Sequence, residues 1–127
     1  MPDLFADAIN SIKVAENAGI DYCIVNNTKL IREFTEVMKK NNYIEEFEVV
    51  KDGKFSKIRV KLAKRINKMG IIKPRFAVGL EEFQKYETRF IPSKDFGILI
   101  LSTPKGIMSN RDAKSMHMGG RLLAYVY

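Results

Sequence analysis

The stretch FGILILSTPKGIMSNRDAKSMHMGGRLLAYVY, residues 96–127, is the most informative part of the chain and decides the fold of its second half. It begins with the apolar run Ile98–Leu101, which is typical of a buried strand. Small hydroxyl residues, a lysine and a glycine follow in a loop at Ser102–Ser109, and then come a short helical segment, a glycine pair and an apolar C-terminal strand. Hydroxyls and glycine at the end of a rigid strand can approach a polar backbone closely, which favours binding over catalysis.

Composition predicts a globular protein made of one ordinary domain or of two very small ones. The chain has 127 residues, of which 46% are hydrophobic and 29% are charged. No apolar run approaches the roughly 20 residues that a membrane-spanning helix needs, and the start of the chain, Met1–Leu4, does not resemble a signal peptide. The single cysteine cannot form an internal disulfide, which is typical of a reducing compartment, so we expect a cytoplasmic protein with no membrane partner.

The two halves of the chain differ in charge. Residues 1–63 carry ten Lys and Arg against ten Asp and Glu, whereas residues 64–127 carry twelve against five, so the second half holds the whole net charge of +7. A neutral half joined to a basic half predicts a structural part and a part that faces a polyanion.

The first half predicts the order α-β-α-β-β. Apolar residues recur at helical spacing from Asp3 to about Ala18, with Asp3 as the N-cap and Gly19 as the end. The run Tyr22–Val25 predicts a buried strand, and Thr28 precedes a second amphipathic helix that ends near Asn41.

A hairpin follows, with strands at residues 43–50 and 55–62 around an Asp-Gly turn. In its second strand Ile58, Val60 and Leu62 alternate with Lys57, Arg59 and Lys61. Period-two alternation predicts a core face and a basic stripe. The stripe is either solvated or, less commonly, in contact with phosphate.

The second half predicts a β-rich part with short helices. We expect an edge strand at Ile71–Phe76, because Pro74 lacks a backbone donor, and a helix at Glu81–Phe90. Buried strands at Ile98–Leu101 and Arg121–Tyr127 complete this half. We therefore predict an α+β fold with an N-terminal α/β domain, residues 1–63, and a C-terminal β-rich domain, residues 64–127, packed on each other at an apolar interface.

Reactive chemistry is not indicated. His117 is the only histidine, and the sequence offers no set of Cys and His residues to hold a metal. Cys23 lies in an apolar run and is expected to be an inert thiol. Glu45 and Glu46 are adjacent in a predicted strand and point to opposite faces, which does not suit acid–base catalysis. Without phosphate-binding glycine loops or a hydrolase nucleophile motif, we expect neither an enzyme nor a cofactor.

Four segments, in the same order, resemble one family. They are the opening helix around Leu4–Asp7, the segment Thr28–Phe47, the segment Ile66–Phe76, and Phe96–Tyr127, which is the most specific of the four. Over essentially its whole length the chain resembles the eighth protein of the small ribosomal subunit, in its archaeal and eukaryotic branch.

The resemblance implies a non-catalytic constituent of the small ribosomal subunit. Proteins of this family are primary binders of the central domain of small-subunit rRNA and help it to assemble, beside neighbouring ribosomal proteins. The family's S-T-x-x-G-[IV]-M segment contacts RNA, which gives Ser102, Thr103, Lys105, Gly106 and Met108, with Ser109 beside them; Met108 either covers an unstacked base or fills the core.

Charge around this segment completes the expected interface. Lys73, Arg75 and Arg121 are expected to attract phosphate, with Lys29 and Arg32 as a second patch in the first half. Bacterial relatives carry a hydroxyl residue in place of Pro104 and an acid in place of Arg121; both departures suit the archaeal and eukaryotic branch.

Two other functions use a similar basic surface. A translational regulator would bind messenger RNA, its own message included, through the same residues, and the sequence does not separate that role from the ribosomal one. A nuclease would need paired histidines or clustered carboxylates, which the sequence lacks.

Overall fold

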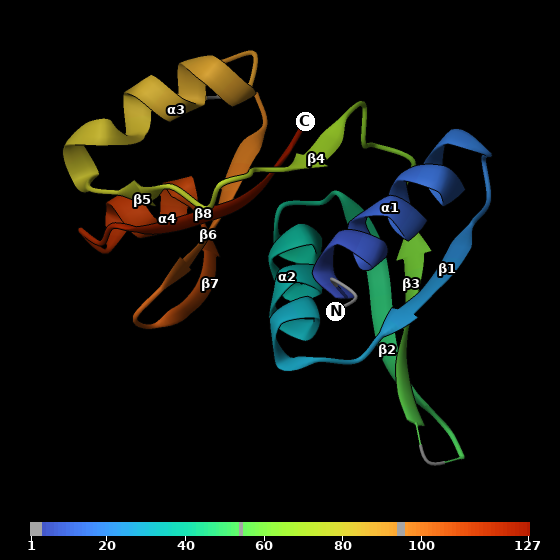
Figure 1. The fold of residues 1–127 in the computed structure, drawn as a ribbon. Helices are drawn as coiled ribbons and strands as arrows, with labels where there is room; N and C mark the ends of the chain where they lie inside the picture. Colours follow the sequence, from blue (N-terminus) through green and yellow to red (C-terminus); the bar gives the residue numbers. More distant parts are fainter. Residues whose placement is uncertain (1–3, 54, 94–95) are drawn as a thin grey trace. The chain divides into compact units, whose positions relative to one another are not determined.

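Two compact units make up the protein in a computed structural model that describes residues 4–53, 55–93 and 96–127 (Figure 1). The first unit is Met1–Ile66 and the second is Asn67–Tyr127. Each unit combines helices with an antiparallel sheet, which confirms the predicted α+β class.

The first unit is a three-stranded sheet with two helices. Its elements are α1 (Leu4–Asn17), β1 (Tyr22–Asn26), α2 (Lys29–Lys40), β2 (Ile44–Asp52) and β3 (Phe55–Leu62), and the strand order is β1-β3-β2. Thr28 is the N-cap of α2, since its hydroxyl accepts the backbone N–H of Ile31 at 3.1 Å. The expected cap of α1, Asp3, lies outside the described residues.

The core of this unit lies between the helices and one sheet face. Ile58, Val60 and Leu62 of β3 are buried as the alternation predicts. On the helices, the rings of Phe5 and Phe34 meet edge to face with their centroids 5.2 Å apart. Such pairs stabilise a core beyond their area of burial.

Strand β1 differs from the prediction of a buried strand. Tyr22 and Ile24 are 41% and 63% exposed, and only Val25 of this strand is fully buried. The reason is that the helices cover one face of this sheet, so alternate side chains of β1 point to the open face, beside Arg59 and Lys61 of β3.

The basic stripe of β3 is neither bare nor simply solvated. Arg59 lies 3.4 Å from Glu48 of β2 and 4.1 Å from the ring centre of Tyr22. Lys61 lies 3.4 Å from Glu45, and Lys57 donates to Asn26. Cross-strand carboxylates therefore pair with two of the three cations of this row, and a neutral amide accepts from the third.

The second unit is a five-stranded sheet with short helices. In it, β4, β8, β6 and β7 lie side by side in that order, and β5 also pairs with β8. The elements are β4 (Met69–Ile71), β5 (Ala77–Val78), the 3-10 turn η1 (Leu80–Glu82), α3 (Phe83–Phe90), β6 (Ile98–Thr103), β7 (Gly106–Ser109), α4 (Asn110–Ser115) and β8 (Gly120–Val126).

The strand expected at Ile71–Phe76 is wrong as a single element. Strand β4 ends at Ile71, and β5 begins only after Phe76. The segment between them still flanks β8, because Ile72 donates to Leu123 O at 3.0 Å and Phe76 O accepts from Leu122 at 2.9 Å. Pro74 has no N–H to continue the ladder, so the pairing is interrupted there.

Helix α3 covers one face of this sheet. Phe83 and Tyr86 are buried there with Leu99, Leu101 and Leu122. The strand expected at Ile98–Leu101 is confirmed as fully buried. The helix expected at Glu81–Phe90 is confirmed from Phe83 onward, after the 3-10 turn η1.

Cys23 in β1 is half-buried, and burial, with a smaller effect of the Glu16 carboxylate, raises the pKa of its thiol from 9.0 to about 11. Only the thiolate is a nucleophile, so a thiol that stays protonated is unreactive.

We expect the Cys23 thiol to react with iodoacetamide at pH 8 one to two orders of magnitude more slowly in the folded protein than in guanidinium. A rise of the pKa from 9.0 to about 11 lowers the thiolate fraction ~100-fold, and the greater nucleophilicity of a basic thiolate offsets part of this. Mass spectrometry of the alkylated protein measures the rate. Equal rates in the folded and unfolded protein would contradict the assignment.

Candidate nucleic-acid interface

The predicted loop at Ser102–Ser109 is a β-hairpin. Strands β6 and β7 pair Ser102 with Ile107 and Thr103 with Gly106, which leaves Pro104 and Lys105 as a two-residue turn. Both turn residues are exposed. Gly106 adopts φ +116, a backbone conformation that other residues rarely adopt. The turn therefore presents Lys105 from a rigid pair of strands.

Thr103 holds this turn together. Its hydroxyl donates to Gly106 O at 2.8 Å and accepts the backbone N–H of Lys105 at 3.2 Å. The residue is only 9% exposed. The Thr103 hydroxyl, an expected RNA contact, thus has its hydrogen bonds within the hairpin.

Ser102 and Arg121 come together although they are 19 positions apart in the sequence. They are direct partners in the antiparallel pairing of β6 with β8, and Arg121 also faces Ala77 of β5. Side chains that face each other across antiparallel strands lie about 5 Å apart at Cβ. Ser102 is half-buried and Arg121 is exposed, so a hydroxyl and a guanidinium lie beside the turn.

The glycine pair allows this approach. A Cβ atom on Gly120 would lie 2.3 Å from the carbonyl oxygen of Ser102, and one on Gly119 would lie 2.4 Å from that of Val78. No side chain fits at such distances. A shallow depression lies here, lined among others by Gly119, Gly120, Ser102 and Arg121.

Two further expected contacts are directed inward. Met108 is only 8% exposed and belongs to the apolar core of the unit. Ser109 is 1% exposed, and its hydroxyl caps α4 by accepting the backbone N–H of Asp112 at 3.2 Å. Of the two alternatives for Met108, the structure has the one in which it fills the core, and the Ser109 hydroxyl serves as the N-cap of α4.

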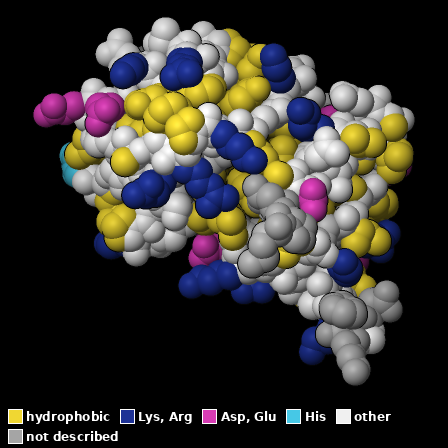
Figure 2. All heavy atoms as spheres, viewed as in Figure 1, with side chains coloured by type: hydrophobic (Ala, Val, Ile, Leu, Met, Phe, Trp, Pro, Cys, Tyr) yellow, Lys and Arg dark blue, Asp and Glu magenta, His cyan; other side chains and the backbone are white. Residues whose placement is uncertain are grey.

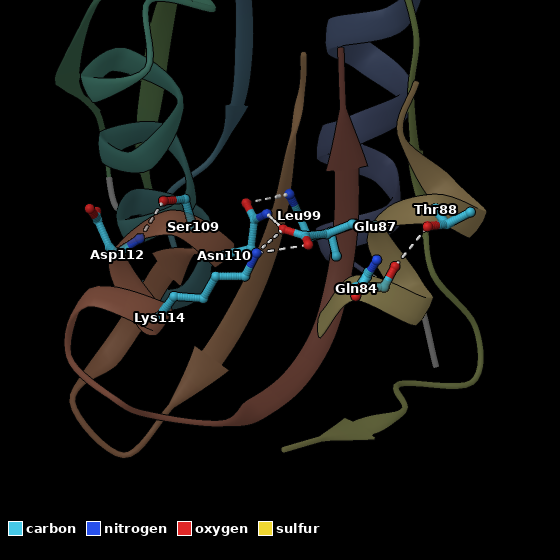
Figure 3. Close-up of polar contacts among 8 residues, drawn as sticks. All are labelled: Gln84, Glu87, Thr88, Leu99, Ser109, Asn110, Asp112 and Lys114. Atoms are coloured by element: carbon cyan, nitrogen blue, oxygen red, sulfur yellow. Dashed lines mark hydrogen bonds and ion pairs between the residues drawn. The ribbon is translucent and has the colours of Figure 1, made fainter. Parts of the chain in front are cut away.

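A buried polar network joins β6 of the hairpin to the helices α3 and α4 (Figure 3). The Asn110 amide accepts the backbone N–H of Leu99 at 3.1 Å and donates to the carboxylate of Glu87. Lys114 donates to both oxygens of that carboxylate, at 2.7 and 2.6 Å. Asn110 is fully buried and Glu87 is 4% exposed, so the network ties α3, α4 and β6 together.

Sequence reasoning missed this network, although one signal was present. Glu87 lies four residues after Phe83, on the apolar side of the predicted helix, where a carboxylate needs a buried partner. Lys114 and Asn110 gave no comparable signal.

Other expected residues lie on two different units. Lys73 and Arg75 are exposed in the segment that flanks β8. This segment leads directly into β5, whose Ala77 pairs with Arg121. Lys29 and Arg32 are exposed in the first turn of α2 in the first unit, and Arg32 donates to Asn27 at 3.0 Å.

Metal and membrane features are absent from the described part of the chain. Residues 4–53, 55–93 and 96–127 contain no group of three Cys, His, Asp or Glu side chains arranged for a metal. In the same residues, no helix combines the length and apolarity that crossing a membrane requires.

We expect Asn110→Ala to lower the free energy of unfolding by about 2–4 kcal/mol, because the buried N–H of Leu99 loses its partner and the buried carboxylate of Glu87 loses one of its donors. Urea titration of the protein followed by circular dichroism measures the loss. Ser115→Ala, at the exposed end of the same helix, is the control and should change stability little. A similar small change for Asn110→Ala would contradict the role of the network.

We expect Gly120→Ala to destabilise the protein by roughly 1–3 kcal/mol, because the new methyl group would overlap the carbonyl oxygen of Ser102. Gly79→Ala is a matched control, since a Cβ there would meet its nearest neighbour at 3.6 Å. Thermal unfolding of both variants measures the difference, and equal stability of the two would show that β8 can move aside.

The sequence matches one family of known proteins over almost its whole length. The family profile described as "Ribosomal protein S8" matches residues 3–127. The chain is 48% identical to the small ribosomal subunit protein uS8 of Methanococcoides burtonii over 98% of its own length and 97% of that protein. It is also 48% identical to the uS8 proteins of Thermoplasma volcanium and Thermoplasma acidophilum, over 98% of both chains in each case. This chain therefore belongs to the ribosomal protein S8 family, a structural and non-enzymatic family, and it resembles the family's archaeal members.

Proposed function

We propose that this protein is a constituent of the small ribosomal subunit that binds the central domain of its rRNA directly and helps that domain to assemble in the cytoplasm. The observation that carries the proposal is the pairing of Ser102 with Arg121 beside the exposed turn at Lys105. The Ser102 hydroxyl, which can both donate and accept a hydrogen bond, therefore lies near the cations Lys105 and Arg121 at one end of the sheet. Neighbouring ribosomal proteins share the same assembly.

The chemistry of this surface suits an RNA helix. RNA displays 2′-hydroxyls and phosphates across a wide shallow groove, where a short rigid projection can reach them. A serine hydroxyl both donates to and accepts from a 2′-hydroxyl, and lysine and arginine attract phosphate without reading sequence. Ser102 therefore contributes selectivity, while Lys105 and Arg121 contribute attraction.

The remaining residues of the expected interface have supporting roles. Thr103 and Gly106 keep the turn in shape, and Met108 and Ser109 anchor β7 and α4 to the core. Lys73 and Arg75 extend the cationic surface along the sheet edge. Lys29 and Arg32 form a second phosphate-binding patch in the first unit.

We expect the protein to retain its preference for one central-domain fragment of rRNA as salt rises, while its affinity falls, because ion release weakens all phosphate contacts alike. Titration of several rRNA fragments at three or more salt concentrations measures both quantities. Equal affinity for every fragment would contradict specific binding. Preference for a messenger RNA fragment over all rRNA fragments would favour a regulatory role instead.

Two substitutions separate selectivity from attraction. Ser102→Ala should weaken binding to the preferred fragment by about 1–2 kcal/mol and leave the salt dependence unchanged. Lys105→Ala should weaken binding to all fragments and reduce the salt slope by about one. Lys13→Ala, at an exposed lysine of α1, is the control and should stay within about twofold of the unmodified protein in affinity. An equal loss of affinity in all three variants would show that the hairpin does not select the RNA fragment.

A further inference from the structure

Four aromatic rings of the second unit form a continuous series that the hairpin does not use. We call Phe90, Tyr125, Tyr127 and Phe96 the aromatic ladder. The ring centres of Phe90 and Tyr125 lie 5.7 Å apart, those of Tyr125 and Tyr127 lie 6.3 Å apart, and both pairs are nearly parallel. The Phe96 ring lies 6.3 Å from that of Tyr127 and is tilted by 49° to it. The rings come from α3, from β8 and the residue that follows it, and from the segment before β6.

Backbone packing fixes the ladder in place. Gly70 of β4 faces Tyr125, and a Cβ atom there would lie 2.7 Å from the Tyr125 hydroxyl. A Cβ atom on Gly97 would lie 2.8 Å from Cβ of Tyr127. Glycine at both positions lets the rings lie down against neighbouring backbone. The ladder is therefore preformed, which lowers the entropy lost when a ligand binds.

The ladder ends at an exposed ring. Phe90, Tyr125 and Tyr127 are half-buried against the core, whereas Phe96 is 53% exposed. A phenylalanine held at the surface leaves apolar area in water, and burying it under a ligand would be favourable. One more flat ring placed on Phe96 would continue the series.

Cations border the ladder. At one end of the ladder the Arg89 guanidinium lies 5.2 Å from the ring centre of Phe90. Lys85, on the same helix, lies 5.4 Å from the ring centre of Tyr86, which is a core residue outside the ladder. Lys68 is exposed, and its backbone pairs with Tyr127 in both directions at 2.8 Å. Among the described residues no carboxylate lies within ion-pair distance of Arg89, Lys85 or Lys68.

Figure 2 shows the same character on one face of the molecule. Hydrophobic side chains gather over the region of α3, Lys and Arg side chains lie around them, and acidic side chains lie at the left end of this region. Aromatic rings bordered by cations are the combination by which proteins hold unpaired nucleotides, since each base stacks on a ring and each phosphate needs a positive neighbour. An acidic or purely apolar partner would leave one of these two features unused.

We propose that the aromatic ladder is a second RNA-binding site, which stacks an unpaired base of RNA on Phe96 and attracts the adjoining phosphate with Lys68, while Arg89, at the Phe90 end of the ladder, attracts a more distant phosphate of the same strand. This goes beyond the proposed function of the hairpin, because it concerns a different surface and a different RNA element. The ligand class is a short single-stranded segment, with no requirement for one base sequence.

Hexauridylate is the probe, and quenching of tyrosine fluorescence is the readout, since the chain has five tyrosines and no tryptophan. Phe96→Ala should weaken binding roughly 5- to 100-fold, the range expected for the loss of one stacked base. Leu80→Ala removes a 43% exposed apolar side chain from the same unit and should have no effect. An abasic oligonucleotide of the same length should bind weakly and equally to the unmodified protein and to Phe96→Ala.

Three further results distinguish the explanations. Phe96→Trp, with binding measured from the quenching of its own tryptophan fluorescence, should bind at least as tightly as the unmodified protein. Ser102→Ala should leave hexauridylate binding unchanged even where it weakens binding to the rRNA fragment. Equal binding by Phe96→Ala and the unmodified protein would overturn the proposal. Full retention of binding by Phe96→Leu would also overturn it, because a purely apolar contact, suited to a protein partner, would then explain the surface.

Discussion

The close backbone approach at the Gly119–Gly120 pair is the constraint on which the second unit depends. Strand β8 enters its sheet between β5 and β6 at this point, where neither neighbouring carbonyl leaves space for a Cβ atom. This entry sets the register that places Arg121 opposite Ser102. The proposed interface is therefore a property of the sheet, because a shift of β8 by one residue would turn Arg121 to the other face.

The hydroxyl-rich segment divides its polar groups between the fold and the surface. Thr103, Ser109 and Asn110 are buried and have hydrogen-bond partners inside the unit. Their desolvation is compensated within the protein, so an RNA ligand need not supply those bonds. The side chains that remain available, Ser102 and Lys105, project from a backbone that is already ordered. Fewer direct contacts then suffice for a selective complex, since less conformational freedom is lost on binding.

Much of the fold could be predicted from the sequence, because its signals are local. Helical spacing located α1 and α2, alternation located the core face of β3, and the apolar run located β6. The prediction failed for Tyr22 and Ile24, since a short apolar run does not reveal that one face of its sheet is left uncovered. It also failed for the segment around Pro74, where pairing with β8 is interrupted.

The site was predictable only in part, because several of its features depend on residues that are distant in the sequence. Ser102 and Lys105 follow a recognisable strand, so their exposure at its end could be expected. The inward direction of Met108 and Ser109 depends on a two-residue turn that sets the pairing of β7, and the role of Asn110 depends on Glu87 from another helix. Long-range partners of this kind leave at most one trace in the sequence, here a carboxylate on an apolar helix face.

The two proposed surfaces of the second unit lie at opposite ends of the same two strands. Arg121 begins β8 beside the hairpin, and Tyr127 follows its end beside Phe96, so the strand separates them by about 20 Å. A serine with flanking cations suits the backbone of a paired helix, whereas stacked rings suit bases without partners. An RNA with an irregular helix offers both elements within such a distance. Because one rigid sheet joins the two surfaces, engagement of the first raises the effective concentration of the second, and two weak contacts can give one stable complex.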